Sequence, residues 1–513
     1  MTNYQFTGGT ICAPATIPGT GAISIIRVSG KESLAIADKV IDTKGVPIAE
    51  TEGYRLRYGT VFEADGSVLD NVIVSVFRAP HSYTGENSVE ISCHASRFIV
   101  NKLLELLVNA GARIAAPGEF TRRAFVNGKM DLAQAEAVAD VIASQSAASH
   151  RVAMNQLKGG FSSELKVLRK KLLTMTSLLE LELDFSEEDV EFASRKELGQ
   201  LVDDSLTHIG RLTASFSRGN AIKNGIPVAI VGATNTGKST LLNALLGEER
   251  AIVSDIAGTT RDTIEETLNI DGILFRFIDT AGIRETDETI EKIGIDRTFK
   301  KLGEAAVVLG MTDLSRGEAA VLEDADFILS KVNEMGETSQ HGHGDGQERK
   351  VVILMNKCDV AGSFYKDDNG TGDGTGNDLD KNMAEIGGNK NVNQNNNIVL
   401  LIENKYDNCK VIPISAKTGK GLSTLTKTLG EIGSEITGST DETLVTNVRH
   451  YEALVRAASA LERVRAGLHI ATLPPDLIAQ DLREALYHLG EIVGEISTDE
   501  TLGNIFRNFC IGK

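Results

Sequence analysis

The stretch GATNTGKS at residues 232–239 most strongly constrains the fold of this chain. It matches the pattern G-x-x-x-x-G-K-[ST] and lies between the apolar run PVAIVGA and the helix-like segment STLLNALLG. In such a loop, backbone N–H groups surround phosphates, the Lys238 ammonium faces the β- and γ-phosphates, and the Ser239 hydroxyl ligates Mg²⁺. We therefore expect a phosphate-binding loop that joins a strand to a helix, rather than a chance glycine-rich turn.

Apolar runs of strand length recur between residues 226 and 435, and each ends in a small polar cluster. They are PVAIVGA, LFRFIDTAG, AAVVLGMTD, VVILMNKCD and KVIPISAKTG. This alternation with helical segments predicts a doubly wound α/β sheet, which binds ligands at the carboxyl ends of its strands.

Two stretches, at about residues 336–350 and 361–398, interrupt the α/β pattern and are rich in Gly, Asn and Asp. Such segments bury too little apolar surface to offset their ordering entropy, so we expect disordered surface insertions. The histidines His341 and His343 fit a solvated loop better than a metal site.

Four further motifs follow the phosphate loop in the order typical of a GTP-binding protein: GTTRD (258–262), DTAG (279–282), NKCD (356–359) and SAK (415–417). Thr260 is predicted to be a second Mg²⁺ ligand, and Asp279 is predicted to hold Mg²⁺ through water. The Asp359 carboxylate can accept two hydrogen bonds from the guanine edge, whereas adenine presents no matching donors. The motifs therefore predict GTP, bound by Asn235, Thr236, Gly237, Lys238, Ser239, Thr240, Thr260, Asp279, Thr280, Ala281, Gly282, Asn356, Lys357, Asp359, Ser415, Ala416 and Lys417.

The sequence contains no recognisable arginine finger. Asn235 lies within the phosphate loop, where its side-chain carbonyl could coordinate a monovalent cation that supplies the charge of the missing arginine. A role for Asn235 in shaping the loop alone is equally open at this point.

The overall composition limits the class of protein. The 513 residues, 41% hydrophobic and 24% charged, are typical of a soluble globular chain of two to four domains. A net charge of −18 means that nucleic-acid binding needs a local basic patch or a basic partner. We find neither a signal peptide nor a membrane-spanning run, and no C-x-x-C pair, which favours the reducing cytoplasm. The five cysteines are Cys12, Cys93, Cys358, Cys409 and Cys510.

The regions on either side of the α/β segment differ from each other in the spacing of their apolar residues. Residues 1–120 alternate short apolar runs with Gly and Pro, which predicts an α+β domain. The runs GAISIIRVSG (21–30), NVIVSVFRAP (71–80) and SVEISCHAS (88–96) are the expected strands. Apolar residues at helical spacing begin near Lys129, continue to about residue 215 and return after about residue 440. We expect a multidomain chain with an N-terminal domain at 1–125, a discontinuous α-helical domain at 126–222 and 439–513, and an inserted α/β domain at 223–438.

With these flanking regions, the chain resembles the MnmE family, also called TrmE, of tRNA modification GTPases. The resemblance covers nearly the whole chain except the two insertions. It is carried by GAISIIRVSG, SYTGENSVEISCH, PGEFTRRAFVNGKMDLAQAEAVADVI, DIAGTTRD, DTAGIRETDETIEKIGI, LVTNVRH and the terminal FCIGK. It implies an N-terminal folate-binding domain that forms a constitutive homodimer, together with a Ras-like P-loop G domain inserted into the helical domain.

The resemblance also implies the reaction, the cofactors and the partners. Family members are potassium-stimulated GTPases that work with an FAD-dependent MnmG-type subunit in a heterotetramer. They install an aminomethyl or carboxymethylaminomethyl group at C5 of wobble uridine 34 of certain tRNAs. The one-carbon donor is a 5,10-methylene- or 5-formyl-tetrahydrofolate.

Transferred by motif position, the resemblance implies several ligand contacts. The folate contacts are Arg27, Glu90, Lys129 and Lys513. The Mg²⁺ ligands are Ser239 and Thr260, and the K⁺ ligands are Asn235, Ser254, Ile256 and Thr259. Ser254 and Thr259 thereby join the predicted GTP-binding residues.

Three residues are candidates for catalysis. The resemblance implies that Glu291 orients the attacking water indirectly, and Lys238 acts on the phosphates. Cys510 fits no prenylation box, since Gly512 and Lys513 break that pattern. It is a candidate for the modification chemistry, as nucleophile or as a positional residue. Phe506 and Phe509 predict that the tail docks rather than frays.

Two other functions compete with this one. A regulatory GTPase switch in ribosome or RNA metabolism would lack one-carbon chemistry, but we find no appended KH-type G-x-x-G module in the sequence. A scaffold with a degenerate G domain would show no GTP turnover.

Overall fold

A computed structural model describes residues 8–184, 194–249, 266–278, 305–338, 349–360, 397–406, 409–438, 442–470, 474–496 and 499–507, with residues 509 and 512. The chain divides into two compact units. Unit 1 comprises Met1–Ser144, Arg151–Thr213 and Val448–Lys513, and unit 2 comprises Gln145–His150 and Ala214–Asn447. None of the described helices is long and apolar enough to cross a membrane.

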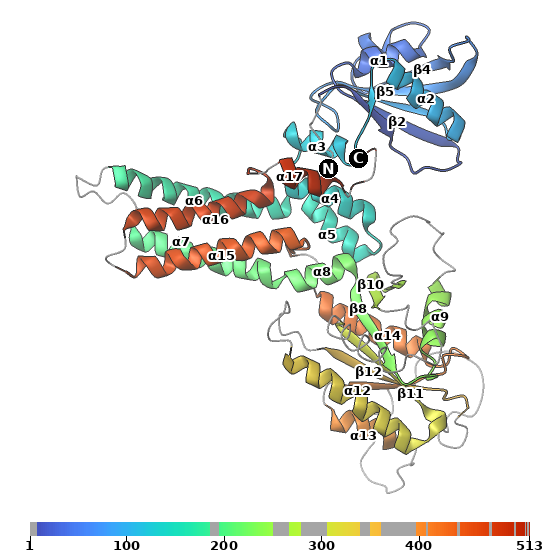
Figure 1. Cartoon of the computed structure of the whole chain (residues 1–513), viewed down its shortest axis with the longest axis vertical. Helices are drawn as coiled ribbons and strands as arrows, with labels where there is room; N and C mark the ends of the chain where they lie inside the picture. The colour runs from blue at the N-terminus through green and yellow to red at the C-terminus, as the bar shows by residue number, and fades with distance from the viewer. Residues whose placement is uncertain are drawn as a thin grey trace, which may run out of the picture. The chain divides into compact units, whose positions relative to one another are not determined.

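Unit 1 begins with a seven-stranded sheet in the order β3-β4-β5-β6-β2-β1-β7 (Figure 1). On β5 the alternating residues Val72, Val74 and Val76 are buried against α1 and α2, as a period of two requires. The strands expected in residues 21–30, 71–80 and 88–96 are present; β4 and α1 were not predicted. The elements are β1 (Ile11–Pro14), β2 (Ile23–Ser29), α1 (Ser33–Val40), β3 (Ile41–Asp42), η1 (Ile48–Glu50), β4 (Arg55–Phe62), β5 (Val68–Phe77), β6 (Ser88–His94), α2 (Arg97–Asn109) and β7 (Arg113–Ile114).

The opposite face of this sheet carries large apolar side chains. Leu56, Tyr58 and Ile73 are exposed, and Tyr58 pairs directly with Ile73 across β4 and β5. A solvated face of an antiparallel sheet is normally polar, so these side chains mark a surface suited to a partner.

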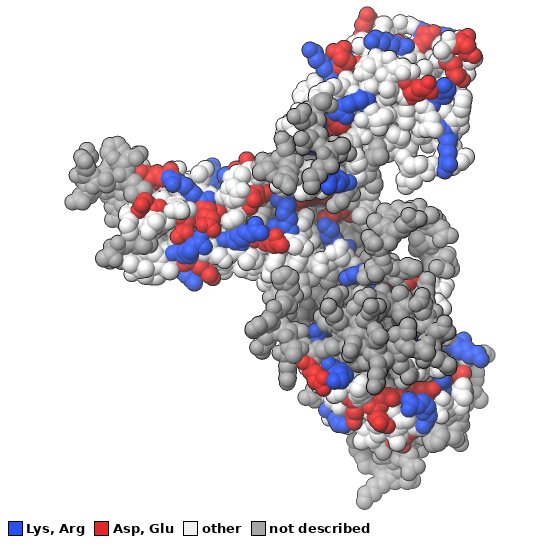
Figure 2. Space-filling view, in the orientation of Figure 1, with Lys and Arg blue, Asp and Glu red and all other residues white. Residues whose placement is uncertain are grey.

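Helices form the remainder of unit 1, and the expected helical domain is present. In α15, Leu454, Ala457, Leu461 and Val464 are buried at helical spacing. Helix α15 packs on α16, and α16 packs on α6 (Figure 1). Basic and acidic side chains are interspersed on the bundle face drawn in Figure 2. The helices are α3 (Glu119–Val126), α4 (Leu132–Ala143), α6 (Gly160–Asp184), α7 (Arg195–Ala214), α15 (Val448–Leu468), α16 (Pro475–Val493) and α17 (Asp499–Arg507), while α5 (Ala147–Leu157) runs from unit 2 into unit 1.

Unit 2 contains a six-stranded sheet in the order β13-β12-β11-β8-β10-β9. All five predicted strands are present and parallel, with α9 and α14 on one face and α12 and α13 on the other. The elements are α8 (Phe216–Asn224), β8 (Ile226–Gly232), α9 (Lys238–Glu249), β9 (Glu266–Ile270), β10 (Ile273–Ile278), β11 (Val307–Asp313), η3 (Leu314–Arg316), α12 (Glu318–Thr338), β12 (Lys350–Asn356), α13 (Asn397–Lys405), β13 (Cys409–Pro413) and α14 (Leu422–Thr437).

Strand β9 was not among the predicted strands, and it pairs antiparallel with β10. Asp271 and Gly272 link the two strands with φ values of 52° and 80°. Two positive φ angles are the mark of a tight hairpin turn, for which Asp-Gly is a strong sequence signal.

The structure describes only the margins of the two predicted insertions. Helix α12 extends to Thr338, β12 starts at Lys350, and α13 starts at Asn397, so the margins of both expected insertions are regular structure. In α13 the apolar residues Ile398 and Ile402 pack against the sheet, which explains why this margin is helical. Residues 339–348 and 361–396 lie outside the described part of the chain.

Candidate functional site

The predicted phosphate-binding loop leaves strand β8, which lies between β11 and β10 in the sheet, and enters α9. Its two glycines leave no room for a side chain. A Cβ on Gly237 would lie 2.4 Å from Asn356 Nδ2, and a Cβ on Gly232 would lie 2.4 Å from the Met311 carbonyl oxygen. The loop therefore takes its path because it packs directly on the ends of neighbouring strands.

Polar contacts within the loop fix its shape. Lys238 Nζ donates to the carbonyl oxygens of Gly232 (2.9 Å) and Ala233 (2.8 Å), and burial lowers the pKa of this ammonium. The Thr236 hydroxyl donates to Ala233 O at 2.8 Å. Asn235 is exposed and has φ of 62°, a left-handed conformation that asparagine tolerates better than most residues. This conformation supports a shaping role for Asn235 and leaves its exposed amide available to a cation.

Asn356 joins three of the predicted motifs. Its Nδ2 donates to Thr236 O at 2.7 Å, and its Oδ1 accepts from Ala416 N at 2.9 Å. The side chain is 3% exposed, so these hydrogen bonds are shielded from water. The phosphate loop, NKCD and SAK thus meet at the carboxyl ends of β8, β12 and β13.

The neighbouring residue Lys357 holds a carboxylate that the sequence analysis did not single out. Lys357 Nζ lies 2.6 Å from Asp313 Oδ2 at the end of β11. Burial alone would raise the pKa of Asp313, but hydrogen bonds from Lys357 and Ser315 outweigh it and lower the pKa. The strand run AAVVLGMTD ends in Asp313. Its position at the end of a predicted strand was the sequence signal that could have identified this residue. Three other predicted site residues are exposed: Asp359, Lys417 and Thr240. Ser239 is half-buried in the first turn of α9.

Several predicted residues lie outside the described part of the chain. They are Ser254, Ile256, Thr259, Thr260, Asp279, Thr280, Ala281, Gly282, Glu291, Cys510 and Lys513. Of the predicted metal ligands, the structure therefore places Ser239 and Asn235, which offer a hydroxyl and an amide oxygen, the hard donors that Mg²⁺ and K⁺ prefer.

A second candidate site lies in the N-terminal sheet of unit 1. Arg27 on β2 stands opposite Glu90 on β6, and its Nε and Nη2 donate to Glu90 Oε1 at 2.9 and 2.8 Å. The guanidinium lies 5.0 Å from the ring centroid of Tyr83 and 5.6 Å from that of Phe120.

The remaining guanidinium nitrogen, Arg27 Nη1, is buried and has no acceptor within hydrogen-bond distance among the described residues. A buried donor of this kind normally has a partner. The nitrogen is therefore a suitable contact for an acceptor group of a ligand.

Lys129 approaches this region from the turn between α3 and α4. Its Nζ donates to Pro80 O at 3.0 Å, and its side-chain carbons lie against Gly85. Its described contacts are thus with the loop between β5 and β6 rather than with Arg27 or Glu90.

A buried ion network that sequence reasoning missed supports the same loop. Arg123 is 4% exposed and donates to both carboxylate oxygens of Glu86, to Glu119 Oε1 and to Gly9 O. Burial would raise the pKa of Glu119, but Arg113, the Ala116 N–H and Arg123 together lower it. The charged residues of the PGEFTRRAF stretch were the sequence signal that could have pointed to this ion network.

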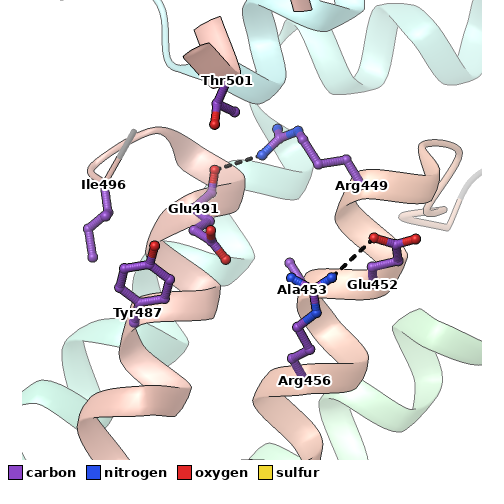
Figure 3. Close-up of a pocket in the computed structure, with 8 residues that line it drawn as sticks. All are labelled: Arg449, Glu452, Ala453, Arg456, Tyr487, Glu491, Ile496 and Thr501. Carbon is purple, nitrogen blue, oxygen red and sulfur yellow. Dashed lines mark hydrogen bonds and ion pairs between the residues drawn. The ribbon is translucent and has the colours of Figure 1, made fainter. Parts of the chain in front are cut away.

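The helical part of unit 1 contains a cavity of about 220 Å³ between α15, α16 and α17. Figure 3 shows Arg449, Glu452 and Arg456 from α15 on one side, and Tyr487 and Glu491 from α16 on the other.

Arg449 also pairs with a buried carboxylate that does not line this cavity. Its Nε lies 2.9 Å from Glu136 Oε1, and His450 Nε2 lies 2.7 Å from Glu136 Oε2. Burial alone would raise the pKa of Glu136, but the charges and hydrogen bonds of His450 and Arg449 hold it at about 2. This network joins α4 to the start of α15.

Comparisons with known proteins match both parts of unit 1 and the segment between them. Residues 10–129 match the model described as the GTP-binding protein TrmE N-terminus, and residues 132–510 match the MnmE helical domain. The tRNA modification GTPase MnmE of Parabacteroides distasonis is 48% identical over 511 residues, covering 98% of this chain and 100% of the relative. The chain belongs to the MnmE family.

Other MnmE proteins align over a similar extent. The tRNA modification GTPases MnmE of Bacteroides thetaiotaomicron and Flavobacterium johnsoniae are 47% and 46% identical, each covering 98% of this chain and 99% of the relative. The relatives therefore match this MnmE-family chain across both units.

Proposed function

We propose that this protein is a potassium-stimulated GTPase that acts in tRNA modification. With an FAD-dependent MnmG-type partner, it installs an aminomethyl or carboxymethylaminomethyl group at C5 of wobble uridine 34. The membership of the MnmE family supports the enzyme class. The junction made by Asn356 carries the GTPase part, because it joins the phosphate loop to both motifs predicted to bind the guanine base.

In this proposal the candidate site residues that the structure describes in unit 2 have distinct roles. The Lys238 ammonium, now on the carbonyl oxygens of Gly232 and Ala233, moves to the β- and γ-phosphates and stabilises their charge. Asp359, exposed beyond the junction, accepts the two guanine hydrogen bonds. Ala416 and Lys417 complete the base pocket, which Asn356 holds against the phosphate loop.

The metal ions would be held by oxygen donors. Ser239 in the first turn of α9 would ligate Mg²⁺ with Thr260, and Asn235 would ligate K⁺ with Ser254, Ile256 and Thr259. Both ions add positive charge beside the phosphates, which is where negative charge grows during hydrolysis. Glu291 would orient the attacking water.

The N-terminal sheet would bind folate. A tetrahydrofolate cofactor supplies a one-carbon unit when bound. The buried Arg27 Nη1 is the donor that fits an acceptor on this ligand, and Glu90 holds the guanidinium over the ring of Tyr83. Lys129 and Lys513 would meet the carboxylate tail.

The exposed apolar sheet face suggests how two copies associate. Leu56, Tyr58 and Ile73 form an apolar surface on β4 and β5, and we assign it to the homodimer contact. The dimer would work in the cytoplasm as a heterotetramer with its FAD-dependent partner and bind tRNA.

The direct test is GTP hydrolysis by the full chain in potassium and in sodium buffer of equal ionic strength. We expect faster turnover in potassium and loss of this difference in Asn235→Ala. Lys238→Ala should be inactive in both buffers. Unchanged potassium stimulation in Asn235→Ala would contradict the cation assignment.

Folate binding by the full chain separates this function from that of a regulatory switch. We expect 5-formyl-tetrahydrofolate to bind the wild-type chain and to bind Arg27→Ala much more weakly. GTP turnover with no detectable folate binding would instead support a switch without one-carbon chemistry.

A further inference from the structure

The NKCD motif makes a tight turn where it leaves β12. Val360 N donates to Lys357 O at 3.0 Å, which closes a turn that contains Asp359. Cys358 N donates to Ile414 O at 3.2 Å and so ties the turn to the residue that follows β13. The backbone of this turn therefore determines where the exposed Asp359 carboxylate points.

Lys357 begins the turn in a strained backbone conformation. Its φ is 65°, which lies in the left-handed region. Glycine enters this region without a steric cost, whereas a residue with a Cβ does not. A strained conformation of this kind persists only where surrounding contacts hold it. The contacts of the Lys357 side chain are therefore the place to look for the cause.

A buried carboxylate holds the side chain of Lys357. Lys357 Nζ lies 2.6 Å from Asp313 Oδ2, and Asp313 is 6% exposed. The other carboxylate oxygen, Asp313 Oδ1, accepts from the Ser315 N–H at 2.9 Å and from the Ser315 hydroxyl at 2.6 Å. One oxygen thus fixes the carboxylate to the start of η3, and the other binds Lys357.

The sheet sets the position of this carboxylate. Asp313 is the last residue of β11, and every residue of that strand is buried. In the parallel pairing of β11 with β12, Asp313 lies opposite Asn356, the residue that precedes Lys357. The carboxylate is therefore fixed by the core of the sheet beside the first residue of the turn.

We propose that Asp313 is a positioning residue for guanine recognition and that it acts through Lys357. Its ion pair holds Lys357 in the left-handed conformation, and this conformation directs the turn so that Asp359 presents its carboxylate to the base. Asp313 itself touches neither the base nor the phosphates. This role rests on the proposed function, in which Asp359 accepts the two guanine hydrogen bonds.

The first variant is Asp313→Asn in the full chain. An asparagine side-chain carbonyl can still accept from Ser315, whereas its amide group offers no negative charge to Lys357. The matched control is Asp326→Asn. Asp326 on α12 pairs with Lys405 of α13 at 2.8 Å, so this variant also loses an ion pair of unit 2.

Two variants of Lys357 separate the backbone from the charge. Lys357→Gly and Lys357→Ala both remove the ion pair and the whole aliphatic side chain. They differ only in the Cβ, which disfavours a positive φ in alanine and is absent from glycine. Calorimetry with GTP, and with ITP, whose base lacks the N2 amino group, measures the affinity and the recognition of guanine. GTP turnover and the melting temperature are measured in parallel.

We expect Asp313→Asn to weaken GTP binding about tenfold, since a displaced Asp359 forms poorer hydrogen bonds with guanine. The preference for GTP over ITP should shrink, because part of it depends on the N2 amino group that Asp359 binds. Turnover at saturating GTP should stay within about twofold, because the substitution affects binding of the base and not the phosphates. Asp326→Asn should match wild type in both affinities.

Lys357→Gly should bind GTP about fivefold more tightly than Lys357→Ala, because glycine adopts the left-handed turn without help from an ion pair. Adding Asp313→Asn to Lys357→Gly should change the affinity by less than about twofold, since the two residues act as a pair.

Equal GTP affinity in Asp313→Asn and Asp326→Asn would overturn the positioning role. An Asp313→Asn variant that loses GTP and ITP affinity by the same factor would also overturn it, because the loss would not concern guanine recognition. Equal GTP affinity in Lys357→Gly and Lys357→Ala would overturn the backbone argument. A wild-type chain that binds GTP no more tightly than ATP would instead refute the proposed function, so the two failures are distinguishable.

Discussion

The candidate nucleotide site of unit 2 and the candidate ligand site of unit 1 are built from different contacts. In unit 2, neutral hydrogen bonds from one buried amide, Asn356, hold three loops that each follow a strand. In unit 1, ion pairs make the corresponding contacts: Arg27 pairs with Glu90 at the candidate site, and Arg449 pairs with Glu136 in the helical part. Substitution of Asn356 should therefore act through local shape, and substitutions of Glu90 and Glu136 through charge.

The largest expected effect is on nucleotide choice in unit 2. Asp359→Ala removes the acceptor of two guanine hydrogen bonds, so GTP affinity should fall by about 10³-fold. Calorimetry with GTP and ATP measures this, and weak ATP binding should be unchanged. Folate affinity should also be unchanged, because the substitution is local. Wild-type GTP affinity in the variant would contradict the assignment of the base pocket.

Charge in unit 1 is tested by Glu136→Gln. This change removes the Glu136 carboxylate from the half-buried Arg449 and the buried His450, so the free energy of unfolding should fall by about 3 kcal/mol. Glu452→Gln on the same helix as Arg449 is the control, since its exposed pair with Arg456 contributes less than about 0.5 kcal/mol. Denaturant unfolding, with hydrogen exchange of the α4 and α15 peptides, measures both. Equal stability of the two variants would refute the role of the network.

The same pair of variants makes a prediction about pH. The pKa of Glu136 is lowered from 4.5 to about 2 in the folded chain, so its contribution to stability is complete above pH 4.5 and is lost as pH falls towards 2. The stability difference between wild type and Glu136→Gln should therefore shrink over this range. A difference that stays constant from pH 5 to the acid limit of folding would contradict the sign of this shift.

The shape of the unit 2 site is tested by Asn356→Ala. It removes two buried hydrogen bonds at the junction, so GTP affinity should fall by about 30-fold, corresponding to about 2 kcal/mol. The effect should not depend on pH between 5 and 8, since neither bond involves an ionisable group. A loss of GTP affinity that varies with pH would mean that ionisable groups, and not neutral hydrogen bonds alone, determine the shape of the unit 2 site.

The smallest expected effect is on folate affinity in unit 1. Glu90→Gln keeps the size of the side chain but weakens its pairing with Arg27, so affinity should fall about fivefold. Glu105→Gln in the exposed Lys102–Glu105 pair of α2 is the control. Equal folate affinity in both variants would remove Glu90 from the candidate site.

The nucleotide region was the more predictable of the two from sequence. Its motifs are contiguous, and each follows an apolar strand run, so the strands and loops could be located without tertiary information. The hydrogen bonds of Asn356 and the ion pair of Lys357 with Asp313 could not be predicted from sequence, because they depend on which strands are neighbours.

The N-terminal region was less predictable because its contacting residues do not form a contiguous ligand-binding motif. Arg27 and Glu90 were identified through the family resemblance, and only the register of β2 and β6 places them opposite each other. In the helical part of unit 1, the pairing of Arg449 with Glu136 also leaves no local signal, since it depends on how α4 and α15 pack.

The most direct test of the whole account is nucleoside mass spectrometry of tRNA from cells that lack this gene. We predict that the C5 substituent of wobble uridine is absent in these cells, returns with the wild-type gene and does not return with the Asp359→Ala gene. Wobble uridines that keep their C5 substituent without the gene, or that regain it with Asp359→Ala, would contradict a GTP-dependent role for this protein in tRNA modification.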